Sequence, residues 1–340
     1  MKNPKNTKPT PDRIMQMSWG YAAPLIIEAA VKHQVFDALA GSPKKVQQLA
    51  RKTGASIRGL TAICHALVGL QLLSRSGVRY RLTPESAAFL VSTKPAYHGA
   101  FFRHVSGQLI PKWLGLDEIV RTGRPRHRVN MEREGAHFFA EFVESLFPLS
   151  YAAARSLGEH LGLRKTRNPV SVLDVAAGSG VWGIALAEQS KLVRVSAADW
   201  PEVLRVTEKV ARKRGVGGQL KKIPGDLLKT DFGKGHHVAT LGHILHSEGA
   251  ARSRKLLQKV FKALAPGGTI AIMEFLVDND RQGPPVGLLF AVNMLVNTEA
   301  GDTFSFEEIS RWLKAAGFVK PRLLNVPAVS PLILATKPND

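Results

Sequence analysis

The stretch Val170-Ser-Val-Leu-Asp-Val-Ala-Ala-Gly-Ser-Gly-Val-Trp-Gly183 places a GxGxxG glycine pattern directly after a run of apolar residues. A buried strand, a glycine turn and a helix in this order are typical of α/β sheets that bind a nucleotide, because the turn lets the ligand approach the backbone. The pattern by itself also fits a dinucleotide-binding fold. The residues around it must therefore decide which ligand is expected.

Beyond this turn the chain alternates between strand and helix patterns. Apolar runs at 193–200, 219–226, 238–245 and 269–277 predict strands, and helical patterns at 201–215 and 253–265 lie between them. Such alternation predicts a Rossmann-like, mostly parallel seven-stranded sheet with helices on both faces, an α/β fold. Two further β runs after a helix at 306–318 predict a terminal antiparallel hairpin.

The N-terminal part has a different pattern. Residues 14–95 show helical periodicity followed by two short strands that a Ser76-Gly77 turn joins, and they predict a mainly helical, winged-helix-like domain. Within it, Ser42 and Pro43 predict the start of a helix that ends at Gly54. Residues 1–13 are expected to be a disordered basic tail. A winged helix can read DNA or serve as a dimerisation platform.

The composition sets limits on the class of protein. The 340 residues contain one cysteine, Cys64, which indicates a reducing compartment, and no run of about 18 apolar residues that would span a membrane. A cytoplasmic protein without a membrane partner is expected. The net charge of +20 could attract nucleic acid, but no aromatic ladder accompanies the basic clusters, so a nucleic-acid partner is not expected. No His, Cys, Asp or Glu set has metal-ligand spacing, so no metal is expected.

Three observations favour a nucleoside sulfonium cofactor over a dinucleotide. Asp174 precedes Gly178 by four residues, where a carboxylate would repel a pyrophosphate but attract a cationic amino-acid group. Asp226 ends a further predicted strand and can accept a hydrogen bond from an adenine amine. Leu264-Ala-Pro-Gly-Gly268 is a tight turn that the dinucleotide fold does not require.

With these residues the chain resembles the class I S-adenosylmethionine-dependent O-methyltransferases of the plant phenolic, acetylserotonin and bacterial polyketide type. The resemblance implies S-adenosylmethionine (SAM) as cofactor, a homodimer formed through the N-terminal domain, a helical linker region at 96–167 that contributes to the acceptor pocket, and a SAM-binding methyltransferase domain at 168–340. It further implies that the backbone at Gly178 and Gly180 holds the methionine part and that Asp199 accepts both ribose hydroxyls. Trp200, Asp226 and Leu227 would border the adenine.

The stretch His243-Ile-Leu-His246-Ser-Glu-Gly249 contains the catalytic candidate. The resemblance implies that His246 is the general base, although Ser247-Glu248 replaces the Asp-Trp that usually follows, and Gly242 replaces a common lysine. Glu274, at the end of the next predicted strand, matches an acidic partner of the base. His243 is expected to be a packing residue.

An acceptor pocket for a small hydroxylated aromatic or polyketide-like substrate is expected from two helical segments. The candidates recur at helical spacing and are Phe138, Phe142, Leu146, Phe290, Asn293, Met294 and Asn297. Three alternatives stay open at this point: a C-methyltransferase or a cofactor-binding relative that transfers no methyl group, a winged-helix DNA-binding regulator, and a nicotinamide oxidoreductase.

Overall fold

The computed structural model describes residues 9–126, 128–129 and 132–339, and the chain divides after Pro111 into two compact units. This boundary differs from the predicted ones at 95 and 167. Helix α10 (Glu132–His160) packs against helices that cover the larger sheet, so the predicted linker region belongs largely to the second unit. Most of the predicted tail at 1–13 lies outside the described residues, but α1 (Asp12–Met17) already begins within it.

The first unit is mainly helical, with a small antiparallel sheet in the order β1-β3-β2. Leu49, Leu60 and Leu67 from its helices share a core with Leu73 and Tyr80 from its strands. Its elements are α1, α2 (Ala22–Lys32), α3 (Val35–Leu39), β1 (Lys44–Lys45), α4 (Val46–Thr53), α5 (Ile57–Gly69), β2 (Leu73–Ser76), β3 (Arg79–Leu82), α6 (Pro84–Phe89), α7 (Gly99–His104) and a π-helical turn at Val105–Leu109. Helix α8 (Ile110–Trp113) spans the boundary.

Two local expectations for this unit need correction. Helix α4 begins at Val46 rather than at Pro43, because Lys44 and Lys45 pair with β3; it ends at Gly54 as predicted, in a left-handed backbone conformation. The hairpin turn consists of Gly77 and Val78, since Ser76 pairs with Arg79. The observed turn therefore lies one residue beyond the predicted one.

The second unit contains the predicted seven-stranded sheet, in the order β6-β5-β4-β7-β8-β10-β9. The first five strands run parallel, and β10 is antiparallel to both β8 and β9, so the terminal hairpin is confirmed. The strands are β4 (Val170–Val175), β5 (Val193–Asp199), β6 (Leu220–Pro224), β7 (His236–Gly242), β8 (Leu264–Met273), β9 (Val319–Leu324) and β10 (Leu332–Thr336).

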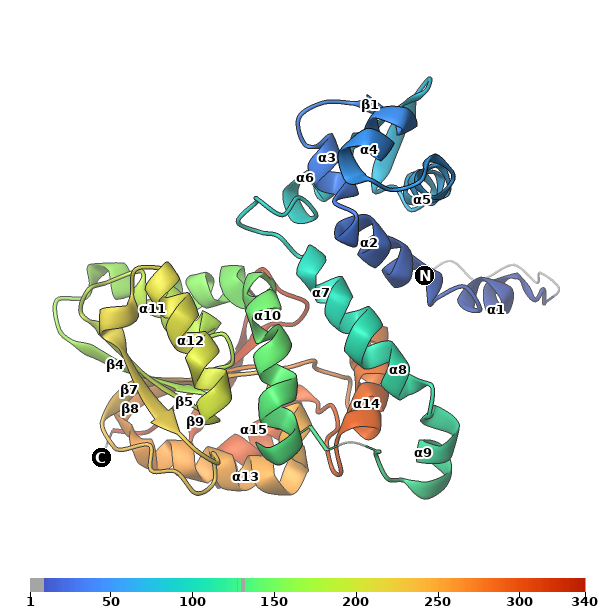
Figure 1. Ribbon diagram of the computed structural model, residues 1–340. Helices are drawn as coiled ribbons and strands as arrows, with labels where there is room; N and C mark the ends of the chain where they lie inside the picture. The colour runs from blue at the N-terminus through green and yellow to red at the C-terminus, as the bar shows by residue number, and fades with distance from the viewer. Residues whose placement is uncertain (1–8, 127, 130–131, 340) are drawn as a thin grey trace. The chain divides into compact units, whose positions relative to one another are not determined.

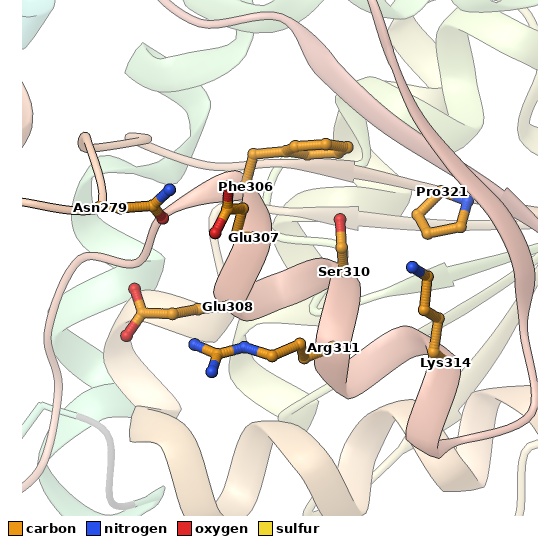
Figure 2. Close-up of a pocket in the computed structure, with 8 residues that line it drawn as sticks. All are labelled: Asn279, Phe306, Glu307, Glu308, Ser310, Arg311, Lys314 and Pro321. Atoms are coloured by element: carbon orange, nitrogen blue, oxygen red, sulfur yellow. The ribbon is translucent and has the colours of Figure 1, made fainter.

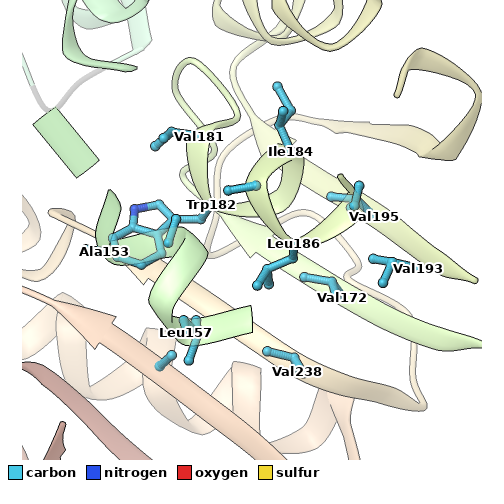
Figure 3. Close-up of a cluster of buried hydrophobic side chains, with 14 of the residues drawn as sticks. Ala153, Leu157, Val172, Val181, Trp182, Ile184, Leu186, Val193, Val195 and Val238 are labelled. Atoms are coloured by element: carbon cyan, nitrogen blue, oxygen red, sulfur yellow. The ribbon is translucent and has the colours of Figure 1, made fainter. Parts of the chain in front are cut away.

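Helices cover both faces of this sheet (Figure 1). On one face lie α10, α11 (Val181–Ala187) and α12 (Pro201–Lys213), whose apolar residues surround Val172 and Val195 (Figure 3). On the other lie α13 (Leu245–Ala263) and α15 (Phe306–Ala315), which pack on Leu173 and Leu241. The strand side chains alternate between these two cores, as a sheet buried on both faces requires.

The remaining elements are α9 (Leu116–Thr122), α14 (Pro285–Asn297) and short 3₁₀ turns at Leu163–Lys165 and Gly217–Gln219. Helix α13 is interrupted at Gly249, where φ is 70° and ψ is 169°. A side chain at this position would overlap the carbonyl oxygen of Ala300. Among the described residues, no helix combines the length and the apolar character that crossing a bilayer would need.

Candidate active site

A cavity of about 550 Å³ opens at the carboxyl ends of β4, β5 and β7. Ligands of open α/β sheets bind at this edge, because the turns after the strands converge there. Five of the predicted cofactor-binding residues line it: Gly178, Asp199, Trp200, Asp226 and Leu227. From α10 the wall includes Phe139, Val143, Leu146 and Ser150, and from the turn after β7 it includes His243, Ile244, Ser247 and Glu248.

The glycine turn after β4 forms the floor of this cavity. Gly178 has a φ of 56°, a conformation that favours glycine, and a Cβ there would be in ordinary contact with Val143 at 3.9 Å and the Ala176 carbonyl oxygen at 4.0 Å. A ligand can therefore approach the backbone at Gly178. Gly180 does not line the cavity; it begins α11, and a side chain there would collide with Thr207 and Ile184. Its role is packing of the turn rather than ligand contact.

Asp199, at the end of β5, faces the cavity and organises the turn. Its two carboxylate oxygens accept hydrogen bonds from the backbone N–H groups of Gly178 (2.9 Å) and Trp200 (2.7 Å). Burial raises the pKa of Asp199 to about 6, although both N–H groups favour the charged form. A carboxylate offers about four acceptor sites, so two remain for hydroxyl groups of a ligand.

Asp174 does not line the cavity, contrary to the prediction. It is 1% exposed, its Oδ2 accepts from the N–H of Gly183 at 2.9 Å, and its Oδ1 accepts from the hydroxyl of Thr240 at 2.8 Å. Burial raises its pKa to about 7. Asp174 ties α11 to β7, and because it is buried outside the cavity wall, it offers no contact to a ligand in the cavity.

A cluster of charged side chains lies at the far end of the cavity. The guanidinium of Arg252 contacts Glu248 at 2.5 Å and Asp226 at 3.8 Å, and all three side chains line the wall. The ring of Trp200 lies 6.1 Å from that of Phe139, centroid to centroid. An aromatic base can bind between such apolar rings and the carboxylate of Asp226.

Packing explains why residue 242 is a glycine, where the resembling family commonly has a lysine. A side chain at 242 would overlap the indole Nε1 of Trp182, which also lines the cavity. Trp182 on α11 therefore fills the space that a lysine side chain would need. At this part of the wall the cavity is bordered by an aromatic ring in place of a cation.

The predicted base and its acidic partner are in direct contact. The Nδ1 of His246 lies 2.6 Å from Oε2 of Glu274, and Oε1 of Glu274 accepts the N–H of Leu245 at 2.7 Å. Both side chains are buried, at 8% and 2% exposed. Burial raises the pKa of Glu274, but His246, His243 and the Leu245 N–H outweigh it and keep the pKa below its usual value. An ionised Glu274 fixes the imidazole so that its other nitrogen is available for proton transfer.

His246 itself does not line the cavity, although Ile244 and Ser247 near it in the chain do. The ring of Phe290 stands edge-on to the imidazole at 4.9 Å, and the ring of Phe275 lies 4.1 Å from that of Phe290, tilted by 34°. The carbonyl oxygen of His246 accepts the N–H of Asp302 at 2.9 Å. Apolar rings around a polar pair make a site suited to an aromatic molecule.

His243 lies beside the pair of His246 and Glu274. The spacing along the sequence does not indicate this grouping. His243, His246 and Glu274 form a group whose potential ligand atoms lie within 4.8 Å of one another. The expectation of no metal was based on spacing along the sequence, and these three residues come together only in the fold, at the ends of strands. Both oxygens of Glu274 already accept hydrogen bonds, so the geometry favours an oriented base over a cation site.

The other predicted acceptor residues lie outside the cavity. Phe138 and Phe142 pack against Phe139, one residue away from the face that lines it. Asn293 accepts a hydrogen bond from the indole of Trp113 at 3.0 Å, and Asn297 donates to Asn293. Met294 is buried in the core. Of the predicted set, Leu146 lines the cavity and Phe290 contacts His246.

The residues of α10 that line the cavity and were not predicted could have been found from their helical spacing. Phe139, Val143, Leu146 and Ser150 follow one another at four, three and four residues, which is one face of a helix. The prediction chose the neighbouring face with Phe138 and Phe142. For Trp182, Lys229 and Arg252 no local pattern indicates a place in the wall.

A second cavity, of about 420 Å³, lies elsewhere on the same unit (Figure 2). It is formed along α15, with Asn279 at one end and Pro321 at the other, and its charged groups are Glu307, Glu308, Arg311 and Lys314. None of the predicted site residues lines it. The cavity at the carboxyl ends of the strands is therefore the candidate active site.

Comparison with known proteins shows to which family the chain belongs. The model of the O-methyltransferase domain matches residues 134–319, and that of the O-methyltransferase dimerisation domain matches residues 15–92. The chain belongs to the O-methyltransferase family. The resemblance drawn from the glycine turn and the histidine motif is thereby confirmed.

Individual relatives of this O-methyltransferase cover nearly the whole chain. The 3-hydroxy-5-methyl-1-naphthoate 3-O-methyltransferase of Streptomyces sahachiroi is 31% identical over 90% of this chain and 89% of its own. A crystal structure from Nostoc punctiforme has a TM-score of 0.88 at 28% identity, covering 97% of this chain and all of that one. Human N-acetylserotonin methyltransferase in complex with SAM has a TM-score of 0.83 at 23% identity, covering 99% and 100%.

The methyltransferase assignment identifies the cofactor as SAM. The O-methyltransferase therefore uses a cationic sulfonium donor and not a nicotinamide. The cavity fits this group, because Gly178 leaves its backbone open and Asp199 retains acceptor capacity toward the cavity.

Proposed function

We propose that this O-methyltransferase transfers the methyl group of SAM to a hydroxyl of a small aromatic or polyketide-like molecule, with His246 as the general base. The contact of 2.6 Å between His246 and Glu274 carries this proposal. It is the arrangement that a proton acceptor needs, because the carboxylate holds one imidazole nitrogen and stabilises the charge that develops on the ring.

The reaction explains why a base is needed. SAM supplies a methyl group on a sulfonium that is open to displacement. A phenol with a pKa near 10 is a poor nucleophile until its proton leaves, and an imidazole with a pKa near 6.5 accepts that proton only as the new bond forms. Glu274 then stabilises the imidazolium. Phe290 and Phe275 exclude water from the pair and hold the acceptor ring.

The proposed contacts to SAM follow from the wall of the cavity. Asp199 would accept the ribose hydroxyls at its two remaining acceptor sites, and the backbone at Gly178 would border the methionine part. Trp200, Asp226 and Leu227 would border the adenine. Asp174 and Gly180 are not part of this proposal, because neither lines the cavity.

The acceptor class rests on two observations. Aromatic and apolar side chains of α10 and α14 surround the site, and the Streptomyces sahachiroi relative is named for a naphthoate acceptor. The exchange of Asp-Trp for Ser247-Glu248 leaves a C-methyltransferase or a non-methylating relative as the alternative. A DNA-binding regulator is not favoured, since Leu60, Cys64 and Leu67 of α5 are buried in the core of their own unit.

The test of the function is direct. Incubation with SAM carrying a labelled methyl group and a panel of hydroxylated naphthoates, polyketides and simple phenols should give a labelled methyl ether for at least one acceptor. The position of the label is then found by NMR. Label on carbon, or no transfer to any panel member while SAM still binds, would contradict O-methylation.

The affinity for SAM should rise with pH. Burial raises the pKa of Asp199 to about 6, and only the ionised form accepts both ribose hydroxyls. SAM binding therefore favours the deprotonated state, and the association constant should increase about tenfold between pH 5 and pH 7 as that state becomes populated. Isothermal titration calorimetry measures it; an affinity that is constant over this range would contradict the role of Asp199.

We also infer a homodimer in the cytoplasm. The match of residues 15–92 to the dimerisation domain supports the dimer. The exposed apolar side chains of Ile14, Met17 and Trp19 support it further, since a patch of this kind usually marks an interface. Sedimentation should give twice the chain mass of 37.0 kDa; a monomer at micromolar concentration would exclude the dimer.

A further inference from the structure

The middle of the first unit is positively charged without compensation. Between Asp37 and Glu85 the chain contains no aspartate or glutamate, but it contains eight cationic residues: Lys44, Lys45, Arg51, Lys52, Arg58, Arg75, Arg79 and Arg81. All of them except Lys44 are exposed. None of the eight forms an ion pair with a carboxylate of the part of the chain that the structure describes.

The small sheet places two of these cations side by side. Lys45 in β1 lies directly opposite Arg79 in β3, so both side chains project from the same face of the sheet. Arg81, two residues further along β3, lies on that face as well, and its Nε donates to the hydroxyl of Ser74 at 2.9 Å. Like charges directly opposite each other destabilise a strand pair. A bound anion would relieve this repulsion.

A cavity of about 470 Å³ lies beside this pair, between α4 and the hairpin. Its wall contains three cations, two amides and one apolar side chain, and no acid: Lys45, Arg51, Arg79, Gln47, Gln48 and Val78. Gln47, Gln48 and Arg51 recur at helical spacing and so share one face of α4. The Nη1 of Arg79 donates to the carbonyl oxygen of Pro43 at 3.3 Å, which orients the guanidinium. An anion in this cavity therefore meets donors from both sides.

The charge of this surface indicates that its occupant is not a second copy of the chain. A two-fold interface brings the same surface of both copies together, and two surfaces rich in unpaired cations repel each other. The apolar side chains that support the dimer, Ile14, Met17 and Trp19, belong to a different segment. The occupant is therefore a molecule of opposite charge.

The surface fits an acidic protein better than a nucleic acid. Tyr80 is the only Phe, Trp or Tyr of the acid-free segment, and it is 3% exposed, so no such ring is available for stacking on bases. At the start of α5 only Arg58 could read a base edge. Val78, at the hairpin turn, is 57% exposed within the cavity wall. An apolar group among cations matches a protein segment in which acidic and apolar side chains are mixed.

We propose that the basic cavity, defined by the six residues of its wall, binds an acidic segment of a partner protein. A carboxylate of the segment accepts paired hydrogen bonds from the guanidinium of Arg51 or Arg79, and Lys45 adds a point charge. Gln47 and Gln48 donate to backbone carbonyls of the segment. None of these residues lines the active-site cavity, so the site is separate from methyl transfer.

The test uses the full chain and a labelled synthetic peptide of glutamate and alanine as the probe, with fluorescence anisotropy as the readout. The variant Lys45→Glu/Arg51→Glu/Arg79→Glu reverses the three charges of the wall. Its affinity for the peptide should fall roughly 10- to 100-fold. The same peptide with glutamine in place of glutamate should not bind to the wild type.

A control variant of equal net charge separates the site from general attraction. Lys213→Glu/Lys221→Glu/Lys255→Glu changes three exposed lysines of the second unit, none of which forms an ion pair among the described residues. This variant should keep the wild-type affinity for the acidic peptide within about twofold, because screening weakens the effect of distant charges.

A single substitution distinguishes binding from a structural role. Lys45→Glu places opposite charges across the strand pair with Arg79, so the thermal midpoint should rise by about 1 to 4 °C while the affinity for the peptide falls. A residue with only a structural role would lose stability and affinity together. Because this change removes a repulsion, it also serves if the triple variant does not fold.

Three results would overturn the proposal. The first is no measurable binding of the acidic peptide to the wild type at low salt. The second is an equal loss of affinity in the two triple variants, since net charge alone would then explain binding. The third is tighter binding of random duplex DNA or of phosphatidylglycerol vesicles than of the peptide, which would assign the surface to a nucleic acid or to a membrane.

Discussion

Replacing His246 by alanine should reduce kcat by about 10² to 10⁴, the contribution of a positioned general base. The loss follows from its geometry: Nδ1 of His246 lies 2.6 Å from the Glu274 carboxylate, and the ring of Phe290 stands edge-on to the imidazole at 4.9 Å. Single-turnover transfer from labelled SAM, with the best acceptor of the panel, measures the chemical step directly. The affinity for S-adenosylhomocysteine should stay within a few-fold of the wild type, since His246 does not line the cofactor cavity.

A matched control for His246→Ala is His33→Ala. His33 is exposed at the end of α2 in the other unit, so its removal should leave turnover at the wild-type level. Turnover by His246→Ala within a few-fold of the wild type would remove His246 from the mechanism. His243 would then be the next candidate for a proton acceptor, because it is the other imidazole grouped with Glu274.

Replacing Asp199 by alanine should weaken SAM binding by about 10² to 10⁴. Each hydrogen bond to a charged group contributes about 1.5 to 3 kcal/mol, and Asp199 would form two with the ribose. The same change leaves the N–H groups of Gly178 and Trp200 without their acceptors, so the glycine turn should lose order as well. Calorimetric titration with SAM gives the affinity, and the thermal midpoint without cofactor reports the effect on the turn.

The control for Asp199→Ala separates ligand binding from capping. Asp231 is exposed and also accepts a backbone hydrogen bond, from Gly233 at 2.9 Å, but it lies outside the cavity. Asp231→Ala should therefore bind SAM as the wild type does. An Asp199→Ala protein that keeps the wild-type affinity would show that the carboxylate only caps the turn.

Much of the fold follows from patterns of short range. Strand β4, the glycine turn and α11 are adjacent in sequence, so their apolar pattern and the glycines predict them together. The predicted start of α4 was wrong because the pairing of Lys44 and Lys45 with β3 depends on residues more than about thirty positions away. The preference of serine for helix N-caps, on which the prediction at Ser42 was based, takes no account of such a distant contact.

The residues of the candidate site likewise fall into those that local sequence patterns predict and those that depend on distant contacts. Asp199 and His246 are predictable because each ends a strand or begins the next helix at the edge where ligands bind. Asp174 has the same kind of position, yet its carboxylate turns inward to Gly183 and Thr240, and only the packing of α11 on β7 decides that. Likewise the choice between the Phe138 face and the Phe139 face of α10 depends on the rotation of one helix about its axis.

The break in α13 at Gly249 has a consequence for divergence among enzymes of this type. The main chain around His246 is held by two hydrogen bonds that do not involve the side chains of residues 245 to 248: the Leu245 N–H donates to the Glu274 carboxylate, and the Asp302 N–H donates to the His246 carbonyl oxygen. Gly249 and Gly301 let that frame pack closely, since a Cβ at 301 would lie 2.5 Å from the His246 carbonyl oxygen. Because the side chains of Ser247 and Glu248 take no part in these two bonds, we expect that enzymes of this type can differ at 247 and 248 while the imidazole keeps its place.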